Sequence, residues 1–299
     1  MDIFSTIPIF TAVVELGSFS EASRKLGITK SAVSKRISTL EVHLGTKLIQ
    51  RTTRKLSLTE AGEQYYSYIH KAEFLVNEAE DAIGSLQGTP RGQLKVSIPT
   101  VFGQLHVAPL LGEFLLRFPD IKLNLSMDDN VVDLIKDGLD MVLRIGALSD
   151  SSLVARKLSS CRSVLCGSPR YFENYGEPKI LNDLKQHNCL YYSYFRSGLE
   201  WAFDGPNGLE RIKPEGNIQV NNSSVLKQLM LNDVGICQMP LFIVEQELAA
   251  GALVTTLEQY RLPEHGIYAV YPQRTFIPAK LKAFLDYLEE KLALKSQIW

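Results

Sequence analysis

The sequence of 299 residues has few of the features that mark membrane, secreted and metal-binding proteins. It contains no run of 18 or more apolar residues, which argues against a transmembrane helix and a membrane partner. Its first residues show no basic segment followed by an apolar one, so no secretory signal is predicted and we expect a cytoplasmic protein. The four cysteines form no Cys-x-x-Cys pair, and no histidine spacing around them resembles a zinc site, so we predict isolated thiols and no metal.

The sequence also lacks the short motifs of common enzyme classes. It has no Gly-x-Ser-x-Gly nucleophile motif, no Walker phosphate-binding motif, no Gly-x-Gly-x-x-Gly motif and no His-Glu-x-x-His zinc motif. Its five histidines are scattered along the chain without the spacing of metal ligands. We therefore predict a protein that is not an enzyme and that uses no cofactor.

The net charge is almost neutral, but the charges are segregated along the chain. The total of -1 combines 32 basic and 33 acidic residues. Residues 18–58 contain nine lysines and arginines against two glutamates, a charge of +7, whereas residues 1–17 carry -2 and residues 59–299 carry -6. A basic module attached to an acidic body is typical of a nucleic-acid-binding domain joined to a second domain. The length and the 45% apolar content fit two or three globular domains.

The first 27 residues carry the signals of two capped helices. Thr6 is placed to cap a helix that ends at Leu16. The segment Ser18-Phe-Ser-Glu21 is a capping box for a short second helix, which ends at Leu26. Gly27 follows at the position where a left-handed residue ends a helix. The two helices are therefore predicted to be short and to be separated by tight turns.

A third helix is predicted from a Thr29 cap to Leu44, with Gly45 as its stop. Its apolar residues recur at spacings of 4, 3 and 4, which predicts one buried face made of Val33, Ile37, Leu40 and Leu44. Two short helices joined by a tight turn that contains glycine are typical of a helix-turn-helix. In that motif the second helix enters the major groove of DNA with its N-terminal end first.

The short basic stretch after this helix predicts a wing. Residues 51–58 are rich in β-branched and basic side chains and favour a two-stranded hairpin beside the helix-turn-helix. Arginines at such a position contact phosphates or enter the minor groove. The predicted DNA-contacting residues share exposure at the start of the third helix or on the wing: Lys30, Ser31, Ser34, Lys35, Arg36, Arg51 and Arg54. A salt bridge from Arg54 to Glu41 or Glu60 is the alternative for that residue.

A long helix is predicted to begin at residues 59–63. Apolar residues recur along it at spacings of 4 and 3 over three heptads: Tyr65, Ile69, Ala72, Val76, Ala79, Ile83 and Leu86. Such a seam is typical of a helix that pairs with a second copy, and dimerisation matters because one helix-turn-helix reads only a half-site. The alternative is an amphipathic helix that packs on its own domain.

Beyond a turn-rich break at residues 88–92 the pattern changes to alternating strands and helices. Strands are predicted at 93–98, 121–127, 139–145, 161–166, 190–194, 217–220, 235–239 and 267–271, and helices at 102–118 and 131–136. Alternation of this kind predicts an α/β domain with a largely parallel sheet.

The sequence resembles the LysR-type transcriptional regulators. The most specific motifs lie in the N-terminal third, and the resemblance covers nearly the whole chain: Ser18-Phe-Ser-Glu-Ala-Ser-Arg-Lys-Leu-Gly27, Thr29-Lys-Ser-Ala-Val-Ser34, Leu40-Glu41, Leu44-Gly45, Arg51-Thr-Thr-Arg54, Leu58-Thr-Glu-Ala-Gly62, Gly92-Gln-Leu-Lys-Val96, Asp133-Leu-Ile, Asp140, Arg144-Ile-Gly146, Asp150-Ser-Ser-Leu-Val154 and Gly235. It departs at Ile49, where the family usually has Phe, and at Asn232-Asp233, where a small Ala-Gly pair is common.

The resemblance implies an α plus α/β architecture in three parts. These are a winged helix-turn-helix at 1–58, a linker and dimerisation helix with a hinge at 59–91, and a periplasmic-binding-protein-like effector domain at 92–299. The effector domain would have two α/β lobes, one formed by about 92–161 and 268–299 and the other by about 162–267. The family also implies homotetramers built from homodimers and a small molecule that switches them.

The effector is expected between the two lobes, at the carboxyl ends of strands. Candidate residues follow predicted strands or begin helices: Thr100, Val101, Asp128, Arg144, Ser193, Tyr194, Asn222 and Ser223. A hydroxyl and free N–H groups at a helix start can hold an anion, and Arg144 can pair with a carboxylate, so we hypothesise an anionic metabolite. Thr100 as a plain helix cap, and Arg144 paired with Asp140 or Asp128, are the alternatives.

The resulting prediction is a sequence-specific regulator of transcription that an effector switches. Its expected partners are double-stranded promoter DNA, a small-molecule effector and further copies of the chain, with RNA polymerase as an additional candidate. Two alternatives stay open: a constitutive DNA-binding regulator whose α/β body only oligomerises, and a solute-binding module. The missing secretory signal and the basic N-terminal module weigh against the latter.

Overall fold

The computed structural model describes residues 5–51, 56–86, 89–130, 133–134, 137–146, 148, 153–194, 198–206, 208–273 and 277–293, with side chains excepted at Arg51, His70, Glu73, Phe74 and residues 77–86. The chain divides into two compact units. The first comprises Met1–Glu80 with Ile135–Gly138, and the second comprises Asp81–Leu134 with Leu139–Trp299. The division falls inside the segment predicted as the linker helix.

The first unit begins with the three predicted helices: α1 (Ile7–Leu16), α2 (Phe19–Leu26) and α3 (Lys30–Leu44). The Ser18 and Thr29 hydroxyls accept hydrogen bonds from the backbone N–H groups of Glu21 and Ala32, which confirms both caps. Thr6 stands at the cap position of α1, but its side chain makes no capping bond. The glycines that follow the three helices are all left-handed, as predicted for helix stops.

One hydrophobic core holds these helices together. Phe10 and Val13 of α1 pack with Val33, Ile37 and Leu40 of α3, and all five side chains are fully buried. The fourth residue of the predicted buried face, Leu44, is 38% exposed, so that part of the prediction was wrong. Leu44 is the last residue of α3, where the chain turns away at Gly45, and its side chain therefore lies at the rim of the core.

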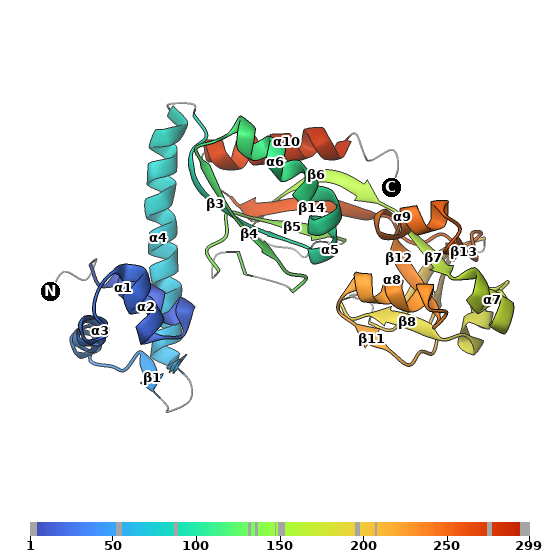
Figure 1. Cartoon of the computed structure of the whole chain (residues 1–299), viewed down its shortest axis with the longest axis horizontal. Helices are drawn as coiled ribbons and strands as arrows, with labels where there is room; N and C mark the ends of the chain where they lie inside the picture. Colours follow the sequence, from blue (N-terminus) through green and yellow to red (C-terminus); the bar gives the residue numbers. More distant parts are fainter. Residues whose placement is uncertain are drawn as a thin grey trace. The chain divides into compact units, whose positions relative to one another are not determined.

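The predicted wing and long helix follow. Strands β1 (Ile49–Arg51) and β2 (Leu56–Leu58) pair in antiparallel fashion, with Ile49 opposite Leu58. Helix α4 (Glu60–Leu86) begins directly afterwards and appears as one long helix in Figure 1. Gly62 in its first turn is required by close packing, because a Cβ atom there would stand 2.0 Å from the carbonyl oxygen of Leu48.

The second unit contains two five-stranded sheets. The first has the order β4-β3-β5-β14-β6 and comprises β3 (Gly92–Ile98), β4 (Ile121–Met127), β5 (Met141–Ile145), β6 (Leu153–Cys161) and β14 (His265–Pro272). Helices α6 (Ala108–Arg117) and α10 (Ala279–Ala293) lie together along it (Figure 1). The predicted lobe boundary at 267/268 falls inside β14, and the whole of β14 belongs to this sheet because it pairs with β5 and β6.

The second sheet has the order β11-β8-β12-β7-β13. Its strands are β7 (Ser163–Gly167), β8 (Cys189–Tyr192), β11 (Gln219–Val220), β12 (Ile236–Pro240) and β13 (Val254–Thr255). Helices α8 (Ser223–Leu231) and α9 (Leu241–Ala249) pack on this sheet. Helix α7 (Pro169–Tyr175), the 3-10 helix Leu181–Gln186 and the hairpin β9 (Trp201–Gly205) and β10 (Gly208–Ile212) enclose a second core that includes Trp201, Phe203 and Tyr191.

The pairing supports the prediction of largely parallel sheets only in part, because two of the four strand pairs in each five-stranded sheet are parallel and two are antiparallel, and it corrects one predicted strand. In each sheet one strand runs against both of its neighbours, β14 in the first and β7 in the second. The single strand predicted over 161–166 is two strands in different sheets, because the chain leaves β6 at Cys161 and enters β7 at Ser163. This short connection carries the chain from the first sheet to the second.

The helical prediction over 102–118 is largely confirmed. The helical segment begins at Thr100 with α5 (Thr100–Phe102), continues through a π-helical turn (Gly103–Val107) and ends with α6. The helix predicted over 131–136 lies mostly outside the described residues, and its described members, Asp133 and Leu134, are not helical.

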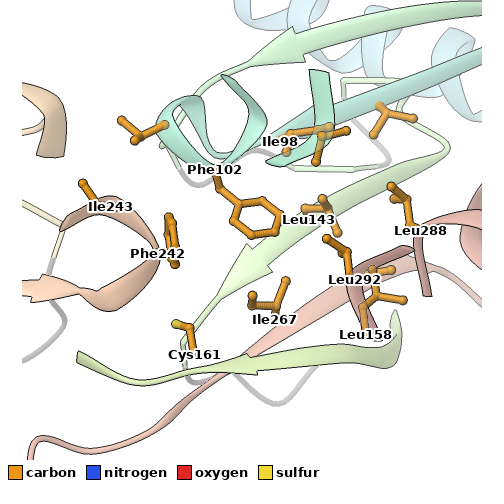
Figure 2. Packing of buried hydrophobic residues seen from close by; sticks show 14 of the residues in the cluster. Ile98, Phe102, Leu143, Leu158, Cys161, Phe242, Ile243, Ile267, Leu288 and Leu292 are labelled. Carbon is orange, nitrogen blue, oxygen red and sulfur yellow. The ribbon is translucent and has the colours of Figure 1, made fainter. Parts of the chain in front are cut away.

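A buried aromatic contact joins the first sheet's helices to those of the second. The rings of Phe102 and Phe242 meet edge to face at 5.3 Å, and His106 packs against both rings. The Nε2 atom of His106 also lies 3.3 Å from the carbonyl oxygen of Phe242. Figure 2 shows Phe102 and Phe242 facing each other in a cluster that continues to Leu143 and Ile267. We call Phe102, His106 and Phe242 the aromatic pivot.

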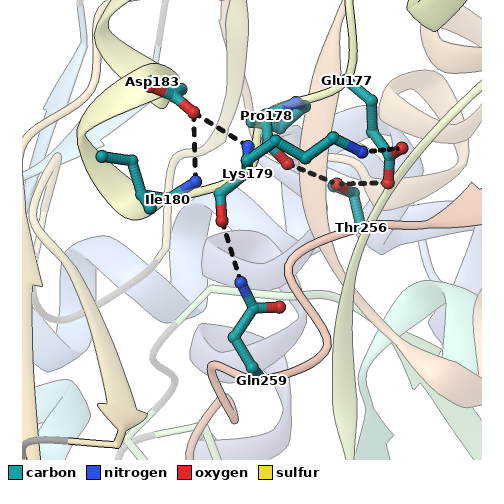
Figure 3. Close-up of polar contacts among 7 residues, drawn as sticks. All are labelled: Glu177, Pro178, Lys179, Ile180, Asp183, Thr256 and Gln259. Atoms are coloured by element: carbon teal, nitrogen blue, oxygen red, sulfur yellow. Dashed lines mark hydrogen bonds and ion pairs between the residues drawn. The ribbon is translucent and has the colours of Figure 1, made fainter.

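The second connection between the sheets runs from β13 to β14 and is fixed at its start by polar contacts (Figure 3). The Thr256 hydroxyl bonds to the Glu177 carboxylate and the Pro178 carbonyl, and the Gln259 amide donates to the Lys179 carbonyl. Asp183 accepts from the backbone N–H groups of Lys179 and Ile180 and holds the same loop. These hydrogen bonds therefore fix the segment after β13 to the loop at residues 177–180 before the chain returns to the first sheet.

Candidate functional site

The exposed face of α3 carries the predicted DNA-contacting residues of that helix. Lys30, Ser31 and Lys35 are exposed, and Ser34 is half-buried. The Ser31 hydroxyl lies 3.0 Å from that of Thr29, which itself caps the helix. Basic and hydroxyl side chains thus occupy the start of a helix whose opposite face is buried, and this is the chemistry that contacts phosphates and base edges.

Arg36 has a partner outside its own helix. Its guanidinium donates to the carbonyl oxygen of Ser5 at 3.5 Å, although the residue is exposed. Of the wing arginines, Arg51 lies in β1, opposite Leu56, and Arg54 lies outside the described residues.

A hollow at the turn between α2 and α3 adds residues that the prediction did not include. Its lining combines the end of α2 with the start of α3: Ser23, Arg24, Gly27, Ile28, Thr29 and Ala32. The Arg24 side chain is exposed and lies 4.0 Å from Glu21, a solvent-exposed pair that contributes little to stability. Arg24 is one of the nine basic residues in residues 18–58, but it was not predicted as a DNA-contacting residue.

A buried carboxylate fixes the wing to α3. The Oε1 atom of Glu41 accepts from the backbone N–H groups of Leu48 and Ile49, at 3.0 and 3.2 Å, and Oε2 pairs with Lys47 at 2.6 Å. Burial raises the pKa of Glu41, but the bonds from Lys47, Ile49 and Leu48 outweigh it and hold the pKa below its ordinary value. Glu41 is therefore charged at neutral pH and orients β1 relative to the recognition helix.

The predicted seam of α4 divides into two parts. Tyr65 and Ile69 pack on their own unit, Tyr65 with its ring 5.4 Å from that of Phe10, as the packing alternative anticipated. Ala72 and Val76 are exposed. Tyr68 and Leu75, which are not in the predicted seam, extend this exposed apolar face. The exposed fractions of Tyr68, Leu75 and the seam residue Val76 are 69%, 62% and 59%. The side chains of Ala79, Ile83 and Leu86 lie outside the description.

The predicted anion site at the start of α5 is engaged by the protein itself. Pro99, and not Thr100, occupies the cap position, so the alternative of Thr100 as a plain helix cap is wrong. The backbone N–H of Thr100 donates to Asp129 Oδ1 at 3.0 Å. The side chain of Val101 is buried in the hydrophobic core.

The predicted effector residues of the second sheet lie at the start of α8 (Asn222 and Ser223) and after β8 (Ser193 and Tyr194). Asn222 caps α8, since its Oδ1 atom accepts from the backbone N–H groups of Ser224 and Val225, and the half-buried Ser223 is the first residue of that helix. Ser193 donates its backbone N–H to the Val220 carbonyl. Tyr194 lies next to it and is partly exposed. The Asn222 amide therefore has a structural task at the helix start.

The remaining predicted residues meet around Asn130, which the prediction did not contain. Arg144 donates from Nη1 to the backbone oxygen of Asn130 at 2.9 Å, and the Tyr194 hydroxyl donates to Asn130 Oδ1 at 2.7 Å. Asp128 Oδ1 accepts from both the backbone N–H and the side-chain amide of Asn130. We call Asp128, Asn130, Arg144 and Tyr194 the mouth cluster. It joins strands of the first sheet to the loop after β8 in the second.

A half-buried phenol, that of Tyr192, borders the mouth cluster. Burial raises the pKa of Tyr192 strongly, and the nearby Asp129 carboxylate and Tyr194 raise it further. The rings of Tyr192 and Tyr194 meet edge to face at 5.7 Å. Tyr192 is therefore neutral at physiological pH and offers an apolar wall beside the polar groups.

Other kinds of site find little support in the described part of the chain. The four cysteines are free thiols, as predicted, and burial raises the pKa of Cys161, Cys166 and Cys189 to about 12. Among the described residues, no group of three or more histidine, cysteine and acidic side chains could hold a metal ion. No described helix is both long and apolar enough to cross a bilayer.

The geometry defines a class of protein. A winged helix-turn-helix with a basic recognition helix is followed by an α/β domain of two sheets, with polar side chains of both sheets meeting at one site. This is the organisation of a DNA-binding regulator with a ligand-binding domain.

Comparison with known families identifies the class more closely. The family described as "Bacterial regulatory helix-turn-helix protein, lysR family" matches residues 4–63, and the "LysR substrate binding domain" matches residues 87–293. The chain belongs to the LysR family of transcriptional regulators. It is accordingly an effector-regulated transcription regulator that binds DNA and forms oligomers, and its family consists of regulators and not of enzymes.

Individual relatives resemble the chain over almost its full length. An uncharacterised helix-turn-helix regulator of Haemophilus influenzae is 35% identical, over 94% of this chain and 98% of its own. The structure of CrgA, a LysR-type regulator from Neisseria meningitidis, is 34% identical with a TM-score of 0.63, and covers 96% of this chain and 98% of its own. The virulence activator AphB of Vibrio cholerae is 28% identical with a TM-score of 0.65, over 95% of this chain and 98% of its own.

Proposed function

We propose that α3 reads the operator from the major groove with Lys30, Ser31, Ser34, Lys35 and Arg36, while Arg51 and Arg54 on the wing contact phosphates or the minor groove. The supporting observation is the two-sided character of α3. Its polar and basic residues are exposed on one side, and Val33, Ile37 and Leu40 are fully buried on the other. The charge of +7 over residues 18–58 supplies the attraction to phosphate.

We further propose that the exposed apolar face of α4 pairs with the same face of a second copy. The predicted seam residues are Tyr65, Ile69, Ala72, Val76, Ala79, Ile83 and Leu86, and the structure adds Tyr68 and Leu75 to the exposed part. An apolar stripe at helical spacing with this exposure is typical of a helix that is buried in an oligomer. Dimers would contact two half-sites, and pairs of dimers would form the tetramer.

The effector proposed for this chain is an anionic metabolite that binds at the mouth cluster, where Arg144 and Tyr194 are the donors. Thr100, Asp128, Ser193, Asn222 and Ser223 surround or support that site in this proposal. Effector binding would change the relative positions of the two lobes and so the spacing of the DNA-binding units, which requires unequal affinity for the two states. A regulator bound at a promoter in the cytoplasm would act on RNA polymerase.

Operator selection from a random DNA library, with the full-length protein, tests the reading of DNA by α3. We expect Ser34→Ala to relax the preference at one or two base pairs by roughly tenfold, since a good base contact discriminates by about 1–3 kcal/mol. Ser38→Ala, one turn further along the helix, is the matched control and should leave the selected sequence unchanged. Identical selected sequences for the parent and Ser34→Ala would contradict the proposed reading.

Footprinting on the selected operator tests the switch. A bound effector should change the length or the spacing of the protected region. The same footprint and the same transcription with and without the effector would contradict an effector that acts through the mouth cluster.

A further inference from the structure

Asn130 holds the centre of the mouth cluster through both of its oxygen atoms. The backbone oxygen accepts from Arg144, which lies on β5 of the first sheet, and the side-chain oxygen accepts from the hydroxyl of Tyr194, which follows β8 of the second sheet. Asn130 thus accepts hydrogen bonds from the guanidinium of one lobe and from the phenol of the other.

The orientation of the Asn130 amide is fixed by its neighbour. Asp128 Oδ1 accepts from the Asn130 amide nitrogen at 2.8 Å and from its backbone N–H at 2.9 Å. A carboxylate only accepts hydrogen bonds, so the NH₂ group must face Asp128 and the carbonyl oxygen must face Tyr194. Asn221 Nδ2 lies 3.4 Å from the Tyr194 oxygen as a donor, which leaves the phenol proton for Asn130.

The two oxygens of Asn130 accept from the two donors, Arg144 and Tyr194, that we assign to the effector. An effector carboxylate also offers two acceptor oxygens, and a charged acceptor makes stronger bonds to a guanidinium than an amide oxygen does. We propose that Asn130 is an internal substitute for the effector: it bonds Arg144 and Tyr194, latches the two lobes together and is displaced when an anionic effector takes over both donors. This inference rests on the proposed location of the effector site.

The strength of the latch suits displacement. Asn130 is exposed and Tyr194 is partly exposed, so water competes for their bond. A net contribution of about 1 kcal/mol for such a bond corresponds to roughly a fivefold change in an equilibrium. The aromatic pivot, by contrast, is buried and makes a contact between the lobes that does not involve Asn130.

Distances between spin labels in the full-length protein test the latch without any effector or DNA. Labels on cysteines introduced at exposed positions, Lys122→Cys in β4 and Leu209→Cys in β10, report the separation of the lobes. We expect Asn130→Ala and Tyr194→Phe each to broaden the distance distribution, and the double variant to do no more than either alone, because both remove the same bond. The matched control is Asn124→Ala, at an exposed asparagine of β4, which should match the parent. Distributions that equal the parent in both single variants would overturn the latch.

Titration with acetate, at constant ionic strength, tests the substitution itself. We expect acetate to shift the label distance at about a fivefold lower concentration in Asn130→Ala than in the parent, because the side-chain oxygen that competes for Tyr194 is gone while the backbone oxygen bonded to Arg144 remains. Acetamide, which is neutral and similar in size, should have no such effect. Equal midpoints in the parent and the variant, no acetate response in either, or an equal response to acetamide would overturn the inference. Operator footprints of the same variants show separately whether the proposed DNA-binding function has failed.

Discussion

The DNA-reading helix and the mouth cluster are supported in opposite ways. The back of α3 is formed by Val33, Ile37 and Leu40, which are fully buried, and the buried Glu41 carboxylate ties its end to β1. The mouth cluster is held by hydrogen bonds between exposed or half-buried side chains. Packed cores change shape reluctantly, whereas exposed hydrogen bonds exchange readily with water. The difference fits a preorganised surface for DNA and a proposed ligand site that can rearrange.

The largest effect is expected on the proposed dimer contact of α4, the helix that follows the DNA-binding helices. Leu75→Glu places a charge on the exposed apolar face of α4, in an interface where burial of each leucine contributes roughly 1.5–3 kcal/mol. We expect the variant dimer to dissociate at a protein concentration about 100-fold higher than the parent dimer, as measured by sedimentation equilibrium. Lys71→Ala on the same exposed helix is the control and should change dissociation only slightly. An unchanged assembly for Leu75→Glu would place the dimer contact elsewhere.

A matched pair of valines on α3 tests the rigid support of the reading surface. Val33 is fully buried and Val42 is 80% exposed, so the same change to alanine creates a cavity only at Val33. We expect Val33→Ala to lower the free energy of unfolding of the first unit by about 2–3 kcal/mol, and Val42→Ala by less than about 0.5 kcal/mol. Urea unfolding followed by hydrogen exchange of α3 measures both. Similar losses in the two variants would contradict the buried back of the helix.

The tie between α3 and the wing should depend on pH. Because the pKa of Glu41 is lower in the folded chain than its ordinary value of 4.5, its stabilisation is complete above about pH 4.5 and is lost as the pH falls through the lower, folded pKa. Glu41→Gln removes this titration and should cost about 1–3 kcal/mol at neutral pH. We expect the difference in melting temperature between parent and variant to shrink below pH 4.5.

An exposed glutamate provides the control for that experiment. Glu63→Gln, in the first turns of α4, should change the melting temperature little at any pH, since the side chain is exposed. A difference between parent and Glu41→Gln that stays constant from pH 7 to pH 3 would show that the Glu41 charge does not support the wing.

The elements of the first unit could be predicted from the sequence because their signals are local. Ser18 bonds to the backbone of Glu21, and Thr29 bonds to that of Ala32, three residues away in each case. Glycines in left-handed conformation end the same helices. Leu44 shows the limit of this reasoning, since periodicity identifies the face of a helix but not where its neighbours stop covering it.

The effector domain depends on contacts that a sequence pattern does not contain. Residues 161–166 form a continuous β-favouring run, yet the partner strands lie in two sheets, and only the pairing of Cys161 with His265 and of Cys166 with Cys237 separates β6 from β7. Helices α7, α9 and α10 and the hairpin β9–β10 were not predicted either. Their apolar faces are complete only against strands that are distant in sequence.

The mouth cluster illustrates the same limit at the level of single residues. Asp128, Arg144 and Tyr194 could be chosen because polar residues at strand ends are typical of ligand sites. Asn130 also follows a strand, but its role depends on Arg144, 14 residues away, and on Tyr194, 64 residues away.

Hydrogen exchange of the full-length protein, resolved to single amides, tests the contrast between the two regions most directly. Without operator or effector, we expect the amides of Val33, Ile37 and Leu40 in α3 to exchange slowly, and that of Asn130 in the mouth cluster to exchange faster by several orders of magnitude. Equal protection of α3 and Asn130, or faster exchange in α3, would contradict a rigid DNA-reading helix joined to a ligand site that is built to rearrange.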